Sequence, residues 1–333
     1  MRVGSTALNM LRGIIAVGAS VLAIGFASAQ EKFTAQVDFS PHGMHAGLHL
    51  AVVKGWFKEA GLDVDVLDGK GSTSTIQQVA AGQIDVGFAQ LAAMAGAVSN
   101  GLPVMSIMGL IRAGDNGLLF PRETGWKSVA DLKGKRIAVP AGSATAFFVD
   151  AFFEAAKVTR SEFTIVNVDS SAMVSTYTVK GVDAVMSTVA FFQPIVEDTR
   201  PSAGIYFSDV GLRIPGYGLL VRTETLEKRA DALTKFVAVQ QRTWNYIFAG
   251  NEEEAVDAML KQRSSMRLDK KVLLGQLKAY MPLFNTPDTQ GKPIGWQSEK
   301  DWAAAIESMQ KVNVVKPGMK PESFFTNRLV PGT

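Results

Sequence analysis

All three histidines of this 333-residue chain lie in one short stretch, "SPHGMHAGLH" at residues 40–49. His42, His45 and His49 are separated by three and four positions, the spacings that bring side chains onto one face of a helix. Imidazoles gathered in this way can bind zinc or copper, or they can line a pocket without a metal. A proline and a glycine in the stretch break a helix at its start, so we expect helical spacing only for His45 and His49. We expect His42 to lie in the turn and to face a ligand, whereas His49 packs against a sheet or is exposed.

Two similar Gly-Ser sequences, "GSTSTI" and "GSATAF", each follow a predicted strand and begin a predicted helix. The N–H groups and partial positive charge of a helix start can hold an anion or a polar ring edge. Ser72, Thr73, Ser143 and Thr145 add hydroxyl groups there. Ordinary N-capping would give the same pattern. In a parallel α/β sheet, however, such helix starts lie at the carboxyl ends of strands, where ligands bind. Two of them, one in each half of the chain, predict a shared ligand site.

Further candidates follow other predicted strands or lie in a connection between the two halves. Gln90 and Thr188 come directly after two matching strands, while Asp115 and Asn116 fall in a glycine-containing connection whose alternative role is turn formation. Phe39 ends the first strand and can stack on a planar ligand, although core packing is the alternative. The residues predicted to bind the ligand are Phe39, Ser40, His42, His45, Ser72, Thr73, Gln90, Asp115, Asn116, Ser143, Thr145 and Thr188. No residue is predicted to be catalytic, to bind a metal or to hold a cofactor.

The elements that position these residues alternate between short apolar strands and amphipathic helices. Strands are predicted at residues 33–39, 62–67, 84–89, 103–111, 136–140, 163–169 and 182–187. Helices are predicted at residues 45–61, 71–83, 91–101, 142–157, 171–181, 225–250, 251–263, 269–281 and 298–312. This βαβα order predicts mostly parallel sheets that are flanked by helices.

The rhythm restarts near residue 136, which indicates two α/β lobes. We expect residues 30–113 and 218–333 to form lobe 1, and residues 114–217 to form lobe 2. Two crossovers, near residues 112–119 and 213–220 where glycines cluster, would then form a hinge beside a cleft.

Composition and the N-terminus limit the compartment and the partners. Arg2 and Arg12 precede an apolar run that is short for a membrane span, and "ASA" at 27–29 suits a signal peptidase. We therefore expect a signal peptide over residues 1–29, cleaved after Ala29, and a periplasmic product. A formal charge of +3 without a basic block argues against nucleic-acid binding. The chain has no cysteine, so disulfides and thiolate catalysis are excluded.

Three quoted segments carry a resemblance to a known family: "DFSPHGMHAGLHLAVVKGWFKEAGLDVDV", "GSTSTIQQVAAGQIDVGFAQ" and "DLKGKRIAVPAGSATAFF". The chain resembles the exported solute-binding proteins for nitrate, sulfonates and thiamine-pyrimidine precursors, which feed ABC importers. The resemblance implies a two-lobed periplasmic binding protein (type II-like) that closes on a small molecule without covalent chemistry. Phe39, Pro41 and His45-Ala46-Gly47 match the pyrimidine-precursor branch, but Phe39 stands where tryptophan is usual and His42 where a polar amide is common.

The resemblance implies a monomer that delivers a pyrimidine-like heterocycle, or an aromatic or anionic compound, to the permease of an ABC importer. A sulfonate- or nitrate-type anion is the alternative ligand. An enzyme that synthesises the pyrimidine precursor is a third hypothesis, because the resemblance extends to fungal enzymes with a cysteine-rich motif. The absence of cysteine disfavours it. A metal-binding protein built on the histidines is the fourth.

Overall fold

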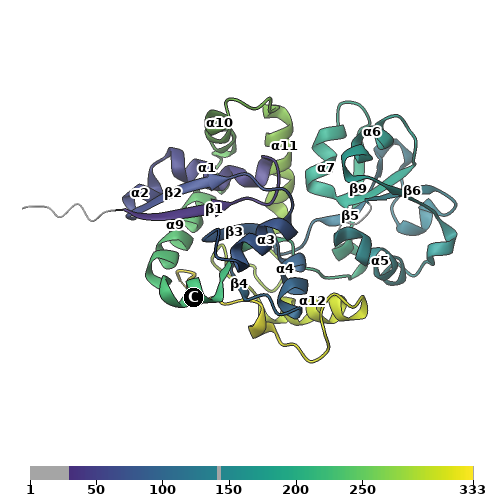
Figure 1. Ribbon diagram of the computed structural model, residues 1–333. Coiled ribbons are helices and arrows are strands. Elements are labelled where there is room, and N and C mark those ends of the chain that lie inside the picture. Colours follow the sequence, from purple (N-terminus) through teal and green to yellow (C-terminus); the bar gives the residue numbers. More distant parts are fainter. Residues whose placement is uncertain (1–29, 141–143, 333) are drawn as a thin grey trace, which may run out of the picture.

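The computed structural model describes residues 30–140 and 144–332, and the predicted signal peptide and Ser143 lie outside these ranges. Figure 1 shows two lobes side by side. The sheet of the first lobe has the order β2-β1-β3-β10-β4. Its strands are β2 (Leu62–Leu67), β1 (Glu31–Gln36), β3 (Val86–Gln90), β10 (Tyr217–Arg222) and β4 (Val104–Gly109). The two-lobed α/β fold predicted from the sequence is confirmed.

The sheet of the second lobe has the order β7-β6-β8-β5-β9. Its strands are β7 (Thr164–Val168), β6 (Arg136–Pro140), β8 (Ala184–Thr188), β5 (Asn116–Pro121) and β9 (Ser202–Tyr206). The two sheets therefore have matching orders, and each contains one strand that runs against the other four. That strand is β10 in the first lobe and β5 in the second.

The two antiparallel strands are the ones that receive the chain after it crosses between lobes. The predicted crossovers at residues 112–119 and 213–220 overlap β5 and β10, so their later residues are strand. Both strands are buried almost throughout, which explains why "GLLF" and "GLLV" show no alternation of apolar and polar residues. By contrast, β2 is an edge strand that exposes Asp63 and Asp65 and buries Leu62, Val64 and Val66, which alternate with them.

Helices cover both faces of each sheet (Figure 1). In the first lobe, one face packs against α1 (Ala46–Val53), α2 (Trp56–Glu59), α9 (Ala230–Phe248) and α10 (Glu252–Gln262). The other face packs against α3 (Ser72–Ala80), α4 (Leu91–Ser99) and α12 (Glu299–Lys311). A short helix, α8 (Thr223–Lys228), follows β10. No helix in the described ranges is long and apolar enough to cross a membrane.

The second lobe packs α5 (Val149–Ala155) on one face of its sheet, and α6 (Met173–Thr178) and α7 (Val189–Val196) on the other. The helix predicted from residue 142 differs from the structure at its start, because a 3₁₀ helix (Ala144–Phe148) precedes α5. The lobes meet where α7 packs against α11 (Lys270–Tyr280) of the first lobe. There the Gln276 amide Nε2 donates to the Phe191 carbonyl at 3.0 Å.

Candidate functional site

A buried carboxylate, Asp38, lies at the centre of the polar cluster between the lobes. It follows β1 by two residues and is 5% exposed. The Nε2 atoms of His45 and His42 lie 2.9 and 3.4 Å from its Oδ1 atom. The Ser72 hydroxyl donates to its Oδ2 atom at 3.2 Å. Asp38 is not among the residues predicted from the sequence. An acid at the carboxyl end of the first strand, beside the predicted Phe39, is the feature that would have indicated it.

The cluster fixes the charge of its members. Burial alone would raise the pKa of Asp38, but the hydrogen bonds from His42 and His45 outweigh it, and the pKa lies well below its usual range. Burial, with the neighbouring His42, lowers the pKa of His45 to about 3. His45 is therefore neutral at pH 7: its Nε2–H donates to Asp38, and its Nδ1 accepts the backbone N–H of His42 at 3.3 Å.

His42 lies in the turn before a 3₁₀ helix (Gly43–His45), as predicted, but it is almost completely buried, with 2% exposure. Its ring meets Phe191 of α7 edge to face, with centroids 5.4 Å apart, and also contacts the rings of Tyr217 and Tyr280. Because Phe191 belongs to the second lobe, His42 lies at the contact between lobes. Its Nδ1 atom is buried without a hydrogen-bond partner in the described ranges.

His49 is remote from this cluster. It is fully buried in α1, where its Nδ1 atom lies 2.6 Å from the Gln262 Oε1 atom of α10. Burial lowers the pKa of His49 to about 4. Of the two fates expected for this residue, packing rather than exposure is correct, although its polar contact is with a helix. The three histidines thus do not form one metal-binding face.

The start of α3 is joined to the Asp38 cluster. Gly71 precedes the helix at φ 124°, and its N–H donates to the Asp38 carbonyl at 2.6 Å. The Ser72 hydroxyl donates to the Asp38 carboxylate and accepts the Gln90 N–H at 3.1 Å, so it is already engaged by the protein. Thr73 is exposed. The Gln90 amide donates to the hydroxyl of Tyr217, which brings β3, β10 and α3 together.

The second lobe contributes a smaller polar group. The Thr145 hydroxyl donates to the Asn116 Oδ1 atom at 2.8 Å, and both side chains are buried. Thr188 is opposite Asn116 in the β5–β8 pairing and is partly exposed. The strand register therefore brings these three predicted residues together.

Asp115, in the first connection, is a second buried carboxylate. It is 0% exposed, and neither of its oxygens accepts a hydrogen bond of ordinary geometry in the described ranges, although the Tyr280 hydroxyl is near enough to lower its pKa in part. Burial raises its pKa to about 7. Burial and the negative charges of Asp38 and Asp115 raise the pKa of Tyr217 well above its usual value, which places both acids near one tyrosine.

Phe39 and Ser40 border the cluster and are exposed, Phe39 at 47%. An exposed aromatic side chain next to buried carboxylates can stack on a planar ligand. Carboxylates accept hydrogen bonds from N–H groups of such a ligand. In the described ranges, the ion pairs of Asp38 are with histidines alone, and Asp115 has none. The cluster thus presents acceptors and aromatic rings rather than cations.

The same geometry bears on a metal. One atom each of Asp38, His42 and His45 lie within 4.8 Å of one another, and two imidazoles with a carboxylate are a familiar donor set. Both imidazoles, however, approach one carboxylate oxygen, at hydrogen-bond distance for His45. Hydrogen bonding accounts for the arrangement.

Comparisons with known proteins show which proteins this chain resembles in sequence and in fold. A formylaminopyrimidine-binding protein of Halalkalibacterium halodurans is 24% identical over 305 residues, which cover 90% of this chain and 91% of that protein. A 4-amino-5-hydroxymethyl-2-methylpyrimidine phosphate synthase of Saccharomyces cerevisiae is 24% identical over 233 residues, 66% of this chain and 68% of that one. Among solved structures, the periplasmic aliphatic sulphonate binding protein of Escherichia coli matches with a TM-score of 0.65 and 14% identity, over 88% of this chain and 91% of that chain. That likeness shows the fold, which is the fold of periplasmic binding proteins.

The family model described as "NMT1/THI5 like" matches residues 42–254, which is more than half of the chain. That range begins at His42 and includes β2 to β10, and so it covers both sheets apart from β1. The chain therefore belongs to the NMT1/THI5-like family.

Proposed function

We propose that this protein captures a small, flat heterocycle that bears N–H donors, such as an aminopyrimidine, between its two lobes. The ligand would lie against Phe39 and donate hydrogen bonds toward the buried acids. The remaining predicted residues of the site, from Ser40 and the helix starts to Thr188, would line the rest of the cleft. The relative that binds formylaminopyrimidine supports this class of ligand.

The observation that carries the proposal is the pair of buried carboxylates, Asp38 and Asp115, with no lysine or arginine of the described residues paired to either. A sulfonate or nitrate needs donors or positive charge, and placing one near two carboxylates would cost electrostatic energy. A sulfonate- or nitrate-type anion, suggested by the structural neighbour, is thus the second candidate.

We propose further that the chain is a transport protein and not an enzyme, although a relative is named as a synthase. No cysteine is present, and the three histidines are packed in the protein or paired with Asp38 or a glutamine. The protein would be exported after cleavage behind Ala29, would act in the periplasm as a monomer without a cofactor, metal or nucleic acid, and would deliver its ligand to an ABC importer permease. We place the lobe limits at residues 113/114 and 217/218.

Calorimetry with the mature protein tests the ligand class. An aminopyrimidine, a formylaminopyrimidine, ethanesulfonate and nitrate are titrated separately into the protein. We expect binding of the pyrimidines, and a loss of about tenfold in affinity for Asp115→Asn, because a hydrogen bond to a carboxylate is replaced by a weaker one to an amide. Asp63→Asn, on the exposed side of β2, is the matched control. Tight binding of the anions with none of the pyrimidines would support the second candidate instead.

Mass spectrometry of small molecules released from protein that was purified without refolding would identify a retained ligand directly. A zinc titration of the same sample addresses the metal hypothesis. Stoichiometric zinc binding that His45→Ala abolishes would contradict the proposal that the site holds no metal.

A further inference from the structure

A cavity of about 320 Å³ lies at the hinge, and none of the predicted ligand-binding residues lines it. Both connections between the lobes contribute to its wall, through Arg112 and Ala113 on one side and Ile214 and Pro215 on the other. The C-terminal helix α12 closes it with Trp302. Cavities near this size, with mostly apolar walls and a few polar groups, are typical of small-molecule sites.

Arg112 supplies this wall with a buried positive charge that makes no ion pair in the described ranges, although Asp301 is near enough to interact with it electrostatically. The side chain is 9% exposed, and its guanidinium donates to the carbonyl of Phe284, to the carbonyl of Trp296 at 2.7 Å and to Asn285 Oδ1 at 2.6 Å. All these acceptors are neutral. No carboxylate of the described residues lies within ion-pair distance of Arg112, whereas Arg213 in the same wall lies 3.3 Å from Asp301 and 3.7 Å from Asp288. A buried cation without a counterion is costly, and an anion in the cavity would offset that cost.

Gln297 supplies unused hydrogen-bond donors beside it. The side chain is 3% exposed, and its Oε1 atom accepts from the Ser106 hydroxyl at 2.9 Å and from the Trp302 indole at 3.2 Å. Its Nε2 atom is buried without a partner in the described ranges. A Cβ atom built on Gly109 would lie 2.8 Å from Gln297 Cγ and 3.5 Å from Arg112 Cγ, so the two side chains flank one backbone position.

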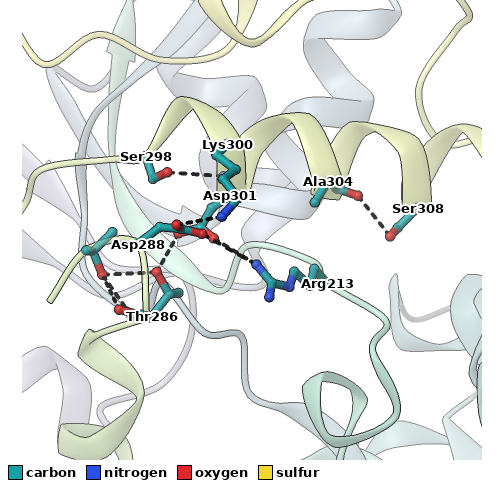
Figure 2. Close-up of polar contacts among 9 residues, drawn as sticks. Arg213, Thr286, Asp288, Ser298, Lys300, Asp301, Ala304 and Ser308 are labelled. Carbon is teal, nitrogen blue, oxygen red and sulfur yellow. Dashed lines mark hydrogen bonds and ion pairs between the residues drawn. The ribbon is translucent and has the colours of Figure 1, made fainter.

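Two acids near the cavity, Asp301 and Asp288, are paired with basic side chains, as Figure 2 shows. Asp301 lies 3.3 Å from Arg213 and accepts the Thr286 hydroxyl at 2.5 Å. Asp288 pairs with Lys300 at 2.9 Å and lies 3.7 Å from Arg213. Of the charged side chains that line the cavity, Arg112 is buried without an ion pair in the described ranges, whereas Asp209 is exposed and accepts the Tyr206 N–H at 2.8 Å.

We propose that the hinge cavity is a second binding site, for a small carboxylic acid with an apolar body. The carboxylate would accept from Arg112 and Gln297, and the body would pack against Ile214, Pro215 and Trp302. An occupant that contacts both connections also affects how one lobe moves on the other. Binding here and binding in the cleft would then change each other's affinity by the same factor.

Benzoate, benzamide and benzylamine test the site because they share a ring and differ in charge. We expect one benzoate per protein in equilibrium dialysis, and affinity about tenfold or more weaker for benzamide, since a charge-assisted hydrogen bond is replaced by a neutral one. Arg112→Met should lower benzoate affinity by a similar factor. Ala113→Phe, at a partly exposed position on the wall, should block binding by filling the cavity. Arg160→Met, which removes an exposed arginine of the second lobe, is the matched control.

Circular dichroism of each variant shows whether it folds. If Arg112→Met does not fold, Ala113→Phe still tests whether benzoate binds in the cavity. Preferred binding of benzylamine would overturn the proposal in favour of a cation site at Asp301. Benzoate binding that survives both cavity variants and disappears in Phe39→Ala would assign the acid to the cleft, and absence of benzoate binding to the folded wild-type protein would also overturn the proposal.

Discussion

Asp38 and Asp115 are both buried carboxylates near the contact between the lobes, yet their surroundings differ. Asp38, at the end of β1, is held by His42, His45 and Ser72, and its pKa lies well below its usual range. Asp115, in the first connection, accepts no hydrogen bond of ordinary geometry at either oxygen in the described ranges, and burial raises its pKa to about 7. The comparison teaches that partners, not depth, decide whether a buried acid is charged. Asp38 therefore stabilises the fold through its hydrogen bonds, whereas Asp115 is available to a ligand.

Replacing Asp38 should have the largest effect on stability. Asp38→Ala leaves the buried donors of His42, His45 and Ser72 without an acceptor, and we expect it to lower the free energy of unfolding by roughly 3–5 kcal/mol. Urea denaturation at pH 7 measures this value. Asp63→Ala, at an exposed position of β2, serves as the control and should change it by less than about 0.5 kcal/mol. Equal losses of stability in Asp38→Ala and Asp63→Ala would show that Asp38 stabilises the fold no more than an exposed acid does.

The pH dependence of the free energy of unfolding tests the expected behaviour of Asp115. The folded-state pKa of Asp115, about 7, lies above the unfolded value near 3.9, so the folded protein binds this proton more tightly. Its contribution is therefore favourable at low pH and is lost as pH rises from about 4 to about 7. Between pH 5 and 8 this amounts to roughly 2–3 kcal/mol.

Asp115→Asn should abolish that part of the slope. Urea denaturation of wild type and variant at pH 5 and pH 8 measures it as a difference of differences, so other titrating groups cancel. An unchanged slope would mean that Asp115 is already ionised and paired in the folded protein. Asp38→Asn should leave the slope between pH 5 and 8 unchanged, because the stability that its lowered pKa contributes is lost only as pH falls below about 4.

Replacing His42 distinguishes an effect on ligand affinity from an effect on the free energy of unfolding. Its contact with Asp38 is longer than that of His45, 3.4 Å against 2.9 Å, and its Nδ1 atom has no partner in the described ranges. We expect His42→Ala to cost about 1–2 kcal/mol of stability, less than Asp38→Ala, and to weaken binding of an aminopyrimidine about tenfold. Calorimetry and urea denaturation give the two numbers. A stability loss as large as that of Asp38→Ala, with binding unaffected, would make His42 a purely structural residue.

Phe39 should show the smallest effect on stability. The side chain is 47% exposed, so Phe39→Ala should change the free energy of unfolding by less than about 0.5 kcal/mol. Loss of a stacking surface should nevertheless weaken binding several-fold, by about 0.5–1.5 kcal/mol. Phe147→Ala, at a 62% exposed position in the second lobe, is the control for removing an exposed phenylalanine. Equal affinity of the two variants would exclude stacking on Phe39.

The alternation of predicted strands and helices was sufficient to predict the fold class. The spacing of apolar residues in an alternating strand or an amphipathic helix indicates which face of that element is buried. It did not reveal β5, β9 or β10. The first and last of these are buried along nearly their whole length, and a continuous apolar run carries no period. Their direction against the other strands depends on the return of the chain between lobes, which is not a local property.

The predicted site residues met different fates. Phe39 and Ser40 border the cluster, His42 and His45 belong to it, and Asn116, Thr145 and Thr188 lie together in the second lobe. Ser72 and Gln90 bond within the protein, and Ser143 lies outside the described residues. Their roles toward a ligand remain predictions. Asp38 was missed because an isolated acid in a sequence does not show what surrounds it.

The sequence by itself determined the α/β class, the two-lobed plan and the position of all histidines in one turn and helix start. Those properties follow from local periodicity and from residue types. Tertiary structure alone decided that His45 meets Asp38, that His49 meets Gln262 and that the Asp115 carboxylate is buried without an ion pair among the described residues. Hydrogen bonds and burial join residues that are far apart in the sequence, such as His49 and Gln262 at 213 positions, and no spacing along the chain encodes them.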